Sequence, residues 1–254
     1  MDHHELLASW LHEEAQPFQG WDFSYLDGRM IEHQPPWSYL ERAAELMGSA
    51  TSVLDLDTGG GERFLELRPY WPGRIAATEN YPPNARLAHQ RLSPLGVKVL
   101  EAASTESAAL PFAKGAFDLV LNRNSSFNAS ELARVLTPGG RFLTNQVHGL
   151  TLSDLLAVFG ASPQWPLASA ERYVPLLEAA GLTIVSVINW QGKLHFSDVG
   201  ALVYFLRAVP WLVSDFNVTT YQDVLFSLQK QVEGGSELSF AARAYLIEAH
   251  NERE

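Results

Sequence analysis

Cysteine is absent from this chain of 254 residues. Disulfide bonds, cysteine–zinc sites and thiol nucleophiles are therefore excluded. Long apolar runs are missing too, since no stretch approaches the roughly 18 apolar residues that a membrane-spanning helix needs. Hydrophobic residues nevertheless make up 46% of the chain, which is ordinary for a globular protein with a sizeable core. The length suits one large domain, or one domain with an elaborated cap.

Basic residues are scarce, with 18 Lys and Arg against 29 Asp and Glu, for a net charge of -11. Phosphate backbones require a cationic surface, and no Lys/Arg cluster supplies one, so a nucleic-acid partner is not expected. Residues 1–16 lack the basic region and apolar segment of a secretory signal and read as an amphipathic surface helix. We expect a cytoplasmic protein with no membrane partner; the oligomeric state is left open.

Short apolar runs alternate with helical stretches through the centre of the chain. The predicted strands are 52–57, 74–79, 97–103, 117–122, 141–147, 182–190 and 240–250. The predicted helices between them are 83–96, 130–140 and 169–181, with Gly96, Gly140 and Gly181 as C-caps. Apolar strands that alternate with helices predict a doubly wound α/β fold with a mostly parallel sheet and helices on both faces.

Two regions fall outside this alternation. We expect residues 1–50 to form an N-terminal helical and aromatic cap segment, and residues 51–254 to form the main domain. Within that domain, residues 191–240 contain two further helical stretches and are expected to be a cap insertion. Helices placed there would lie over the carboxyl ends of the strands, where open α/β sheets bind their ligands.

The stretch "VLDLDTGGGERF" (53–64) combines a strand, a glycine-rich turn and the start of a helix, which together can hold a ligand by the backbone. A phosphate P-loop would need a lysine after Gly61, and none follows. A dinucleotide loop needs G-x-G-x-x-G, whereas the three glycines here are contiguous. The remaining interpretation is an S-adenosylmethionine loop, an acidic residue followed by glycines. Glu79 ends the next strand and either accepts both ribose hydroxyls of an adenosine or caps its own turn.

Four segments resemble the class I S-adenosylmethionine-dependent methyltransferases: "VLDLDTGGG", "ATENYPPN", "LPFAKGAFDLVLNRNSSF" and "ARVLTPGGRFLTNQV". The pattern LPF-x4-FD-LV followed by RVL-x-PGG-x-F is typical of the small-molecule subgroup. The resemblance runs from about residue 53 to 147 and continues towards 250. It implies a seven-stranded sheet with an antiparallel last strand, and S-adenosylmethionine as cofactor. It says little about the substrate.

The resemblance also implies roles for individual residues. Gly59 and Gly61 would lie beneath the methionine and ribose portions, Asp55 would orient the amino group, and Asn80 would lie beside the adenine. The cofactor-binding residues implied in this way are Asp55, Asp57, Thr58, Gly59, Gly60, Gly61, Glu79, Asn80, Ser104, Thr105, Glu106 and Asn122. The family usually has an acidic residue at the adenine; counting along the chain leaves Ser104, Thr105 and Glu106 open for that role.

Asp57 departs from the family pattern, which usually has a glycine or another small residue at this position. Three alternatives stay open. The carboxylate pairs with the ammonium or sulfonium charge of the cofactor, or it is only solvated at the strand end, or it marks a site that has lost its cofactor.

Methyl transfer from a sulfonium is an in-line displacement in which positioning does much of the work, and a base is needed only for an acceptor that must lose a proton. The N/D-PP-Y/F motif of amino-group methyltransferases is missing. The catalytic candidates are His148, a possible base after the fifth strand, and Arg123, which suits an anionic group. The substrate candidates at strand ends and in the cap are Tyr25, Trp37, Asn124, Gln146 and Trp211. No histidine spacing indicates a metal site.

The leading interpretation is a methyltransferase that acts on a small molecule. The alternative from another class is a catalytically silent protein that keeps the fold and binds the cofactor or serves as a scaffold. A methyltransferase acting on RNA or protein is disfavoured by the net charge and the lack of a basic arm.

Overall fold

The computed structural model describes residues 2–18 and 22–252, and the chain divides into two compact units. Unit 1 comprises residues 1–35, 148–167 and 190–243; unit 2 comprises 36–147, 168–189 and 244–254. Each unit is thus built from three separate segments. The domain boundaries expected from the sequence, 1–50 and 51–254, stay a prediction; the compact units divide the chain at other positions.

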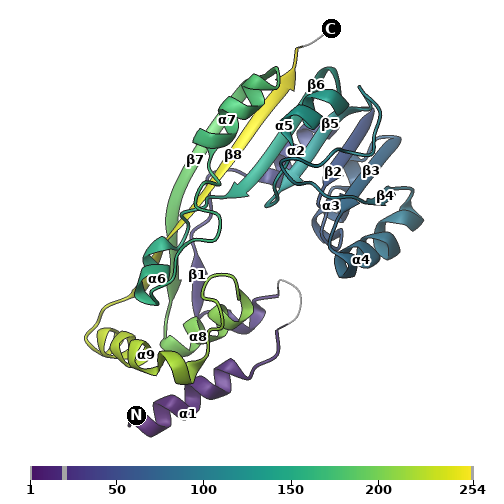
Figure 1. Ribbon diagram of the computed structural model, residues 1–254. Coiled ribbons are helices and arrows are strands. Elements are labelled where there is room, and N and C mark those ends of the chain that lie inside the picture. Colours follow the sequence, from purple (N-terminus) through teal and green to yellow (C-terminus); the bar gives the residue numbers. More distant parts are fainter. Residues whose placement is uncertain (1, 19–21, 253–254) are drawn as a thin grey trace. The chain divides into compact units, whose positions relative to one another are not determined.

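Unit 2 holds the parallel part of the sheet (Figure 1). Its parallel strands are β2 (Ser52–Leu56), β3 (Arg74–Glu79), β4 (Lys98–Glu101), β5 (Phe117–Arg123) and β6 (Leu136–Val147). β2 lies between β3 and β5, and β8 (Leu238–Asn251) pairs with β6 in the antiparallel direction. The doubly wound fold with an antiparallel last strand is therefore confirmed.

Helices cover both faces of this sheet because its strands are apolar on both sides. The helices of unit 2 are α2 (Tyr39–Met47), α3 (Glu62–Glu66), α4 (Pro82–Leu92), α5 (Ala129–Val135) and α7 (Ala170–Ala179). Val53 packs in one core with residues of α2, α3 and α4, while its neighbour Leu54 packs in a second core with residues of α5 and α7. Successive strand residues point to opposite faces, so this one pair shows the two layers.

The predicted helix 130–140 is too long. Asn128 caps α5 by accepting hydrogen bonds from the backbone N–H groups of Ser130 and Glu131, and the helix ends at Val135. β6 begins with the next residue, and Gly140 lies within that strand instead of at a helix end. The helical pattern of this segment is short, and Leu136 pairs with Phe117 of β5, so the strand begins there instead. Gly96 and Gly181, by contrast, follow helices in the left-handed conformation, as expected.

The sheet has eight strands, so the predicted seven is one short. The extra strand is β1 (Met30–Glu32), which pairs antiparallel with the end of β7 (Leu182–Phe196) through Met30 opposite Phe196. The full order is β1-β7-β8-β6-β5-β2-β3-β4. Three residues that are largely exposed carry no period-two pattern, and this explains why the strand was missed. β7 and β8 are long enough to run from unit 2 into unit 1.

Unit 1 is built around one buried helix, α8 (Val199–Ala208), in which every residue except Arg207 is buried. A helix that is apolar on all sides must be surrounded. Its neighbours in the core come from α1 (His3–Glu14), α6 (Ser153–Val158) and α9 (Val218–Glu233). α1 is the amphipathic helix expected from the sequence, and its Trp10 lies 4.9 Å from the ring of Phe226 in α9.

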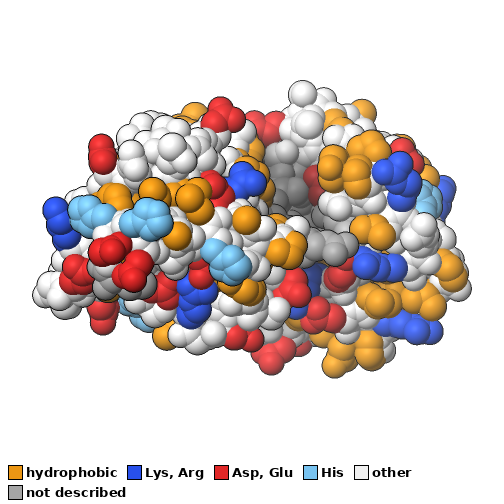
Figure 2. Space-filling view, turned by 90° about the horizontal axis from the view of Figure 1, so that it is seen from below, with side chains coloured by type: hydrophobic (Ala, Val, Ile, Leu, Met, Phe, Trp, Pro, Cys, Tyr) orange, Lys and Arg blue, Asp and Glu red, His pale blue; other side chains and the backbone are white. Residues whose placement is uncertain are grey.

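The surface carries mixed charges. On the face that Figure 2 shows, Lys and Arg side chains are scattered among acidic ones. Within residues 2–18 and 22–252, no helix combines the length and the apolar character needed to cross a membrane.

Candidate functional site

Polar side chains gather at the carboxyl ends of the parallel strands in unit 2. Parallel pairing places Leu56 of β2 beside Asn122 of β5, and Asp55 beside Ala77 of β3. The ends of the three strands therefore lie together, and this is where open α/β sheets hold their ligands.

The loop from Asp57 to Gly61 turns the chain from β2 into α3. Asp57 (φ 52°), Gly59 (φ 63°) and Gly61 (φ 85°) all adopt left-handed conformations. This conformation suits glycine, and aspartate is one of the few other residues that adopts it readily. A Cβ at Gly61 would lie 2.8 Å from Leu92, whereas a Cβ at Gly59 would meet no atom within 4 Å. The loop is thus packed against α4 at Gly61 and open at Gly59.

Glu79 ties this loop to β3. Its Oε2 accepts a hydrogen bond from Gly59 N at 2.8 Å, and its Oε1 accepts from Asn80 N at 2.8 Å and Tyr81 N at 2.7 Å. Glu79 therefore does cap its own turn, as one of the two alternatives expected. A carboxylate offers about four acceptor positions, so one remains for a ligand. The ribose role stays a prediction.

The carboxylates of Asp55 and Asp57 lie in surroundings that disfavour their charged forms. Burial is the largest cause that raises the pKa of Asp55 to about 7; the Thr58 hydroxyl opposes this rise, and the charge of Asp57 adds to it. Burial likewise raises the pKa of Asp57 to about 6, against the effect of the Ser104 hydroxyl and with that of the charge on Glu79. No Lys, Arg or His among the described residues lies within 4.0 Å of these carboxylates.

Asn122 is the centre of a buried polar network at the end of β5. Its Oδ1 accepts from Thr144 Oγ1 at 2.8 Å and Gln146 Nε2 at 2.6 Å, and its Nδ2 donates to Ser125 Oγ at 2.6 Å. Ser104 Oγ donates to Asp57 at 3.0 Å from the other side. Gln146, predicted as a substrate residue, is buried in this network, and its role towards a substrate stays a prediction.

A second group of side chains surrounds the same strand ends. Trp37 Nε1 donates to Asn145 Oδ1 at 2.8 Å. The hydroxyl of Tyr39 is buried without a hydrogen-bond partner, and burial, followed by the charge of Asp55, raises its pKa well above the ordinary value. Asn124 has a left-handed φ of 54° and, like Arg123, an exposed side chain.

Sequence reasoning did not select Tyr39, Ser125, Thr144 and Asn145 as site residues. Tyr39 opens α2 two residues after the selected Trp37, and that nearness was the available signal. Ser125 stands directly beyond the selected Asn124. For Thr144 and Asn145 no signal distinguishes the side chains before the pairing of β5 with β6 is known.

The adenine segment follows β4 and offers three candidates. Ser104 is buried and bonded to Asp57, and Thr105 is exposed. Glu106 accepts from Arg172 at 2.6 Å and from the hydroxyl of Tyr173 at 3.0 Å, so its carboxylate is engaged with α7. Asn80 is exposed beyond β3. Which of these residues contacts an adenine stays a prediction.

The remaining candidates, His148, Tyr25 and Trp211, belong to unit 1. His148 Nδ1 accepts from Leu150 N at 3.0 Å, so in the neutral ring the proton lies on Nε2. Tyr25 packs 4.6 Å from the ring of Tyr204.

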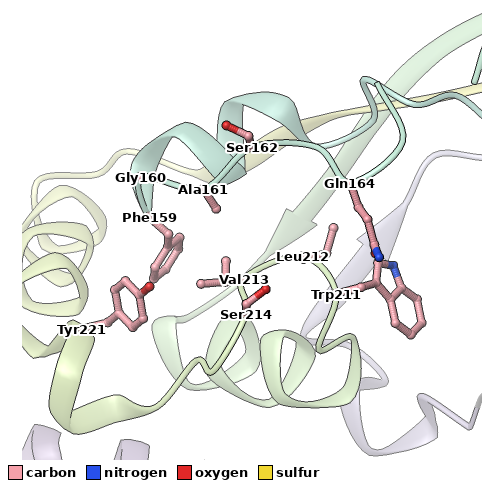
Figure 3. Close-up of a pocket in the computed structure, with 10 residues that line it drawn as sticks. All are labelled: Phe159, Gly160, Ala161, Ser162, Gln164, Trp211, Leu212, Val213, Ser214 and Tyr221. Atoms are coloured by element: carbon pink, nitrogen blue, oxygen red, sulfur yellow. The ribbon is translucent and has the colours of Figure 1, made fainter. Parts of the chain in front are cut away.

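Trp211 lines a hollow of about 460 Å³ in unit 1 (Figure 3). The lining residues are Phe159, Gly160, Ala161, Ser162, Gln164, Trp211, Leu212, Val213, Ser214 and Tyr221. None of them is charged. The volume lies in the range of small-molecule sites, but the hollow contains none of the loop and carboxylate residues of unit 2. We therefore base the functional argument on the strand ends.

Comparisons with known proteins find similarity over this part of the chain. Residues 54–144, from β2 to β6, match the family model described as "Methyltransferase domain". A malonyl-[acyl-carrier protein] O-methyltransferase of Herminiimonas arsenicoxydans is 29% identical over 181 residues, which are 66% of this chain and 67% of that protein. A demethylmenaquinone methyltransferase of Thermus thermophilus is 37% identical over 101 residues, but the match covers only 36% of this chain and 44% of that protein.

A solved structure extends the likeness in fold to the whole chain. A functionally unknown protein from Deinococcus radiodurans R1 aligns with a TM-score of 0.58 at 16% identity, covering 98% of this chain and 99% of that one. Within the described residues, no group of three or more His, Asp or Glu side chains is arranged to hold a metal ion. The loop, the strand order and the family match together lead to one conclusion: residues 54–144 match the methyltransferase domain, and the fold of the chain resembles that of the class I S-adenosylmethionine-dependent methyltransferases.

Proposed function

We propose that the protein transfers a methyl group from S-adenosylmethionine to a small-molecule acceptor. The observation that carries the proposal is the loop from Asp55 to Gly61, which Glu79 holds through the Gly59 N–H. The loop ends a buried parallel strand, has an open side at Gly59 and bears carboxylates that, among the described residues, form no ion pair within 4.0 Å, with Arg123 as the cation that lowers the pKa of Asp55 from a distance. The methyltransferase match over residues 54–144 supports the same proposal.

The charges of this site fit the cofactor. S-adenosylmethionine carries a sulfonium and an ammonium against a single carboxylate, so it brings a net positive charge. Asp55 and Asp57 are raised in pKa because burial and mutual repulsion disfavour their charged forms, and a cation would relieve both. We assign Asp55 and Asp57 to the cationic methionine end and Glu79 to the ribose. Asn80 and the segment from Ser104 to Glu106 are left for the adenine.

When bound, the cofactor supplies an already activated methyl group. The protein then has to orient the acceptor and keep water away. A base is needed only for an acceptor that must lose a proton. His148 stays the base predicted from the sequence; it belongs to unit 1, and because its Nδ1 accepts from Leu150 N, the neutral ring already carries a proton on Nε2 and would have to release the Leu150 bond to accept another. Arg123 is proposed to bind an anionic part of the acceptor.

The acceptor is proposed only as a class. The two relatives are named for different acceptors, a malonyl group on an acyl-carrier protein and demethylmenaquinone, so neither name transfers to this chain. Within unit 2, the proposed acceptor contacts are Trp37, Asn124 and Gln146, while Tyr25 and Trp211 of unit 1 stay predictions from the sequence.

One observation favours a second candidate, a catalytically silent protein that binds the cofactor. The acidic side chain of the adenine segment, Glu106, is engaged with Arg172 and Tyr173. Asp57 also replaces a small residue of the family pattern.

Calorimetry on the full chain tests the cofactor, with S-adenosylmethionine and S-adenosylhomocysteine as ligands. We expect both to bind, and Glu79→Ala to weaken each at least about tenfold because the ribose contact and the Gly59 bond are lost. Glu178→Ala, on an exposed glutamate of α7, is the matched control and should change neither affinity. No binding by the unmodified chain would refute the proposal.

Turnover is tested next with cell extract fractionated by size. Release of S-adenosylhomocysteine with the small-molecule fraction is the expected result. Release only with the macromolecular fraction would transfer the activity to an RNA or protein acceptor. Binding without release in either fraction would favour the silent protein.

A further inference from the structure

Asp57 occupies a position built around a carboxylate. Its backbone is left-handed at φ 52°, which fixes the direction of the side chain. Ser104, from the loop after β4, donates to Asp57 Oδ1 at 3.0 Å. Ser125, from the loop after β5, acts on the same carboxylate through its hydroxyl. Two loops on opposite sides therefore supply hydroxyl groups to this one side chain.

The hydrogen bonds behind Ser125 all run in one direction. Gln146 donates to Asn122 Oδ1, and Asn122 Nδ2 donates to Ser125 Oγ. Because Ser125 already accepts this bond, its own hydrogen is available for Asp57. Asn122 is fully buried and Gln146 nearly so. Such a network orients donors towards Asp57, and this argues against both the solvated strand end and the decaying site as explanations of the residue.

The same strand ends hold three carboxylates, and Arg123 lowers the pKa of one of them, Asp55. The charges of Asp57 and Glu79 raise the pKa of Asp55, and the charge of Glu79 raises the pKa of Asp57. The described residues place no cationic nitrogen within 4.0 Å of any of them. Beside Asp55, the buried hydroxyl of Tyr39 has no hydrogen-bond partner. Carboxylates whose pKa is raised by burial and which form no ion pair indicate a cationic ligand.

We propose that Asp57 makes the site select by charge between the cationic methyl donor and the neutral thioether product. This inference rests on the proposed function. In the transfer, a lone pair of the acceptor forms the bond to the methyl carbon, and the carbon–sulfur bond breaks with its electron pair remaining on sulfur. The cofactor thereby loses its sulfonium charge while keeping nearly the same outline. A carboxylate near the sulfur binds the donor more tightly than the product, and so favours product release.

The experiment measures the dissociation constants of S-adenosylmethionine and S-adenosylhomocysteine by calorimetry at pH 7.5. The variants are Asp57→Asn, which keeps the size and tolerates the left-handed backbone, and Asp57→Gly, which restores the family residue. Glu178→Gln removes one exposed charge of unit 2 and is the control. We expect both Asp57 variants to lower the ratio of product to donor dissociation constants about tenfold, mainly through weaker donor binding.

An analogue with a protonated amine in place of the methylsulfonium should follow the donor and not the product. Ser104→Ala removes one of the two hydroxyl donors to Asp57. Its ratio of product to donor dissociation constants should lie closer to that of the unmodified protein than the ratios of the two Asp57 variants do. If donor and product weaken by the same factor, Asp57 supports the loop and does not read charge, and the inference is wrong while the proposed function stands. If the donor binds Asp57→Gly more tightly, charge pairing is also refuted. If the unmodified chain binds neither ligand, the proposed function fails first.

Discussion

Replacing Gly61 by alanine tests whether close packing against Leu92 is the reason that the loop has a glycine at this position. Gly61 has a φ of 85°, and a Cβ there would lie 2.8 Å from Cδ1 and 2.9 Å from Cγ of Leu92. Leu92 is fully buried at the end of α4, so it has no free space to move into. Gly59 is the matched control, because its φ of 63° is also left-handed but its Cβ would meet nothing within 4 Å.

The magnitudes separate two effects. An alanine in the left-handed conformation costs about 1–2 kcal/mol, and this applies to both glycines. Overpacking a filled core adds about 1–3 kcal/mol, and this applies to Gly61 alone. We therefore expect Gly61→Ala to lower the free energy of unfolding by about 2–5 kcal/mol in total, against about 1–2 kcal/mol for Gly59→Ala.

Urea unfolding of the full chain, followed by tryptophan fluorescence, measures both values. Adding Leu92→Ala creates room for the new methyl group, so the double variant with Gly61→Ala should lose less stability than the sum of the single variants. Equal losses for the two glycine variants, or full additivity with Leu92→Ala, would refute the packing argument and leave backbone strain as the sole cause.

Three further outcomes are expected. Folding raises the pKa of Asp57 from 3.8 to about 6, so the ionisation of Asp57 lowers the free energy of unfolding as the pH rises from about 4 to 6. Asp57→Asn should remove this contribution of Asp57, which urea unfolding at pH 4.5 and at pH 7 measures. The variant should be more stable than the unmodified protein at pH 7. Glu248 is 3% exposed and forms ion pairs with both Arg42 and Arg141. The double variant Arg42→Ala with Arg141→Ala should therefore lose more free energy of unfolding than the two single variants together, because it leaves a buried carboxylate without a partner. Simple additivity in this double-mutant cycle would contradict the shared pairing. Asp198→Ala removes the N-cap of α8 and an ion pair with Arg29, and should lower the free energy of unfolding by about 1–3 kcal/mol. Asp198→Asn should keep the cap and lower it by less. Equal losses for the two variants in thermal unfolding would assign the effect to the charge.

Most of unit 2 was predictable from sequence because its elements carry their own signals. β2 and β3 are largely apolar runs, each followed by or ending in a carboxylate. Asn128, a residue type common at helix N-caps, precedes α5. The end of that helix was not predictable, since the pairing of Leu136 with Phe117 of β5 decides where β6 begins. β1 was missed for the same reason, because three residues become a strand only through the partner that β7 offers them.

The loop of the site was predictable, but its partners were not. Asp57 was recognised as a departure from the family pattern, and its left-handed backbone explains why a glycine is usual there. That Ser104 and Ser125 converge on it could not be derived, because the two serines are brought together by the order of strands and not by spacing along the chain. Likewise, the engagement of Glu106 with Arg172 and Tyr173 depends on where α7 packs.

The three-segment construction of unit 1 has a consequence for protein synthesis. Leu6 and Trp10 of α1 are buried against helices whose residues follow only from Val199 onwards. At 5–20 residues per second, the ribosome makes the intervening ~185 residues in roughly 10 to 40 s. During that interval α8 and α9 do not yet exist to cover the apolar face of α1, whereas β2 to β6 are complete once residue 147 has been made. A nascent chain of this protein therefore exposes the apolar face of α1 to chaperones and proteases until α8 and α9 have been made.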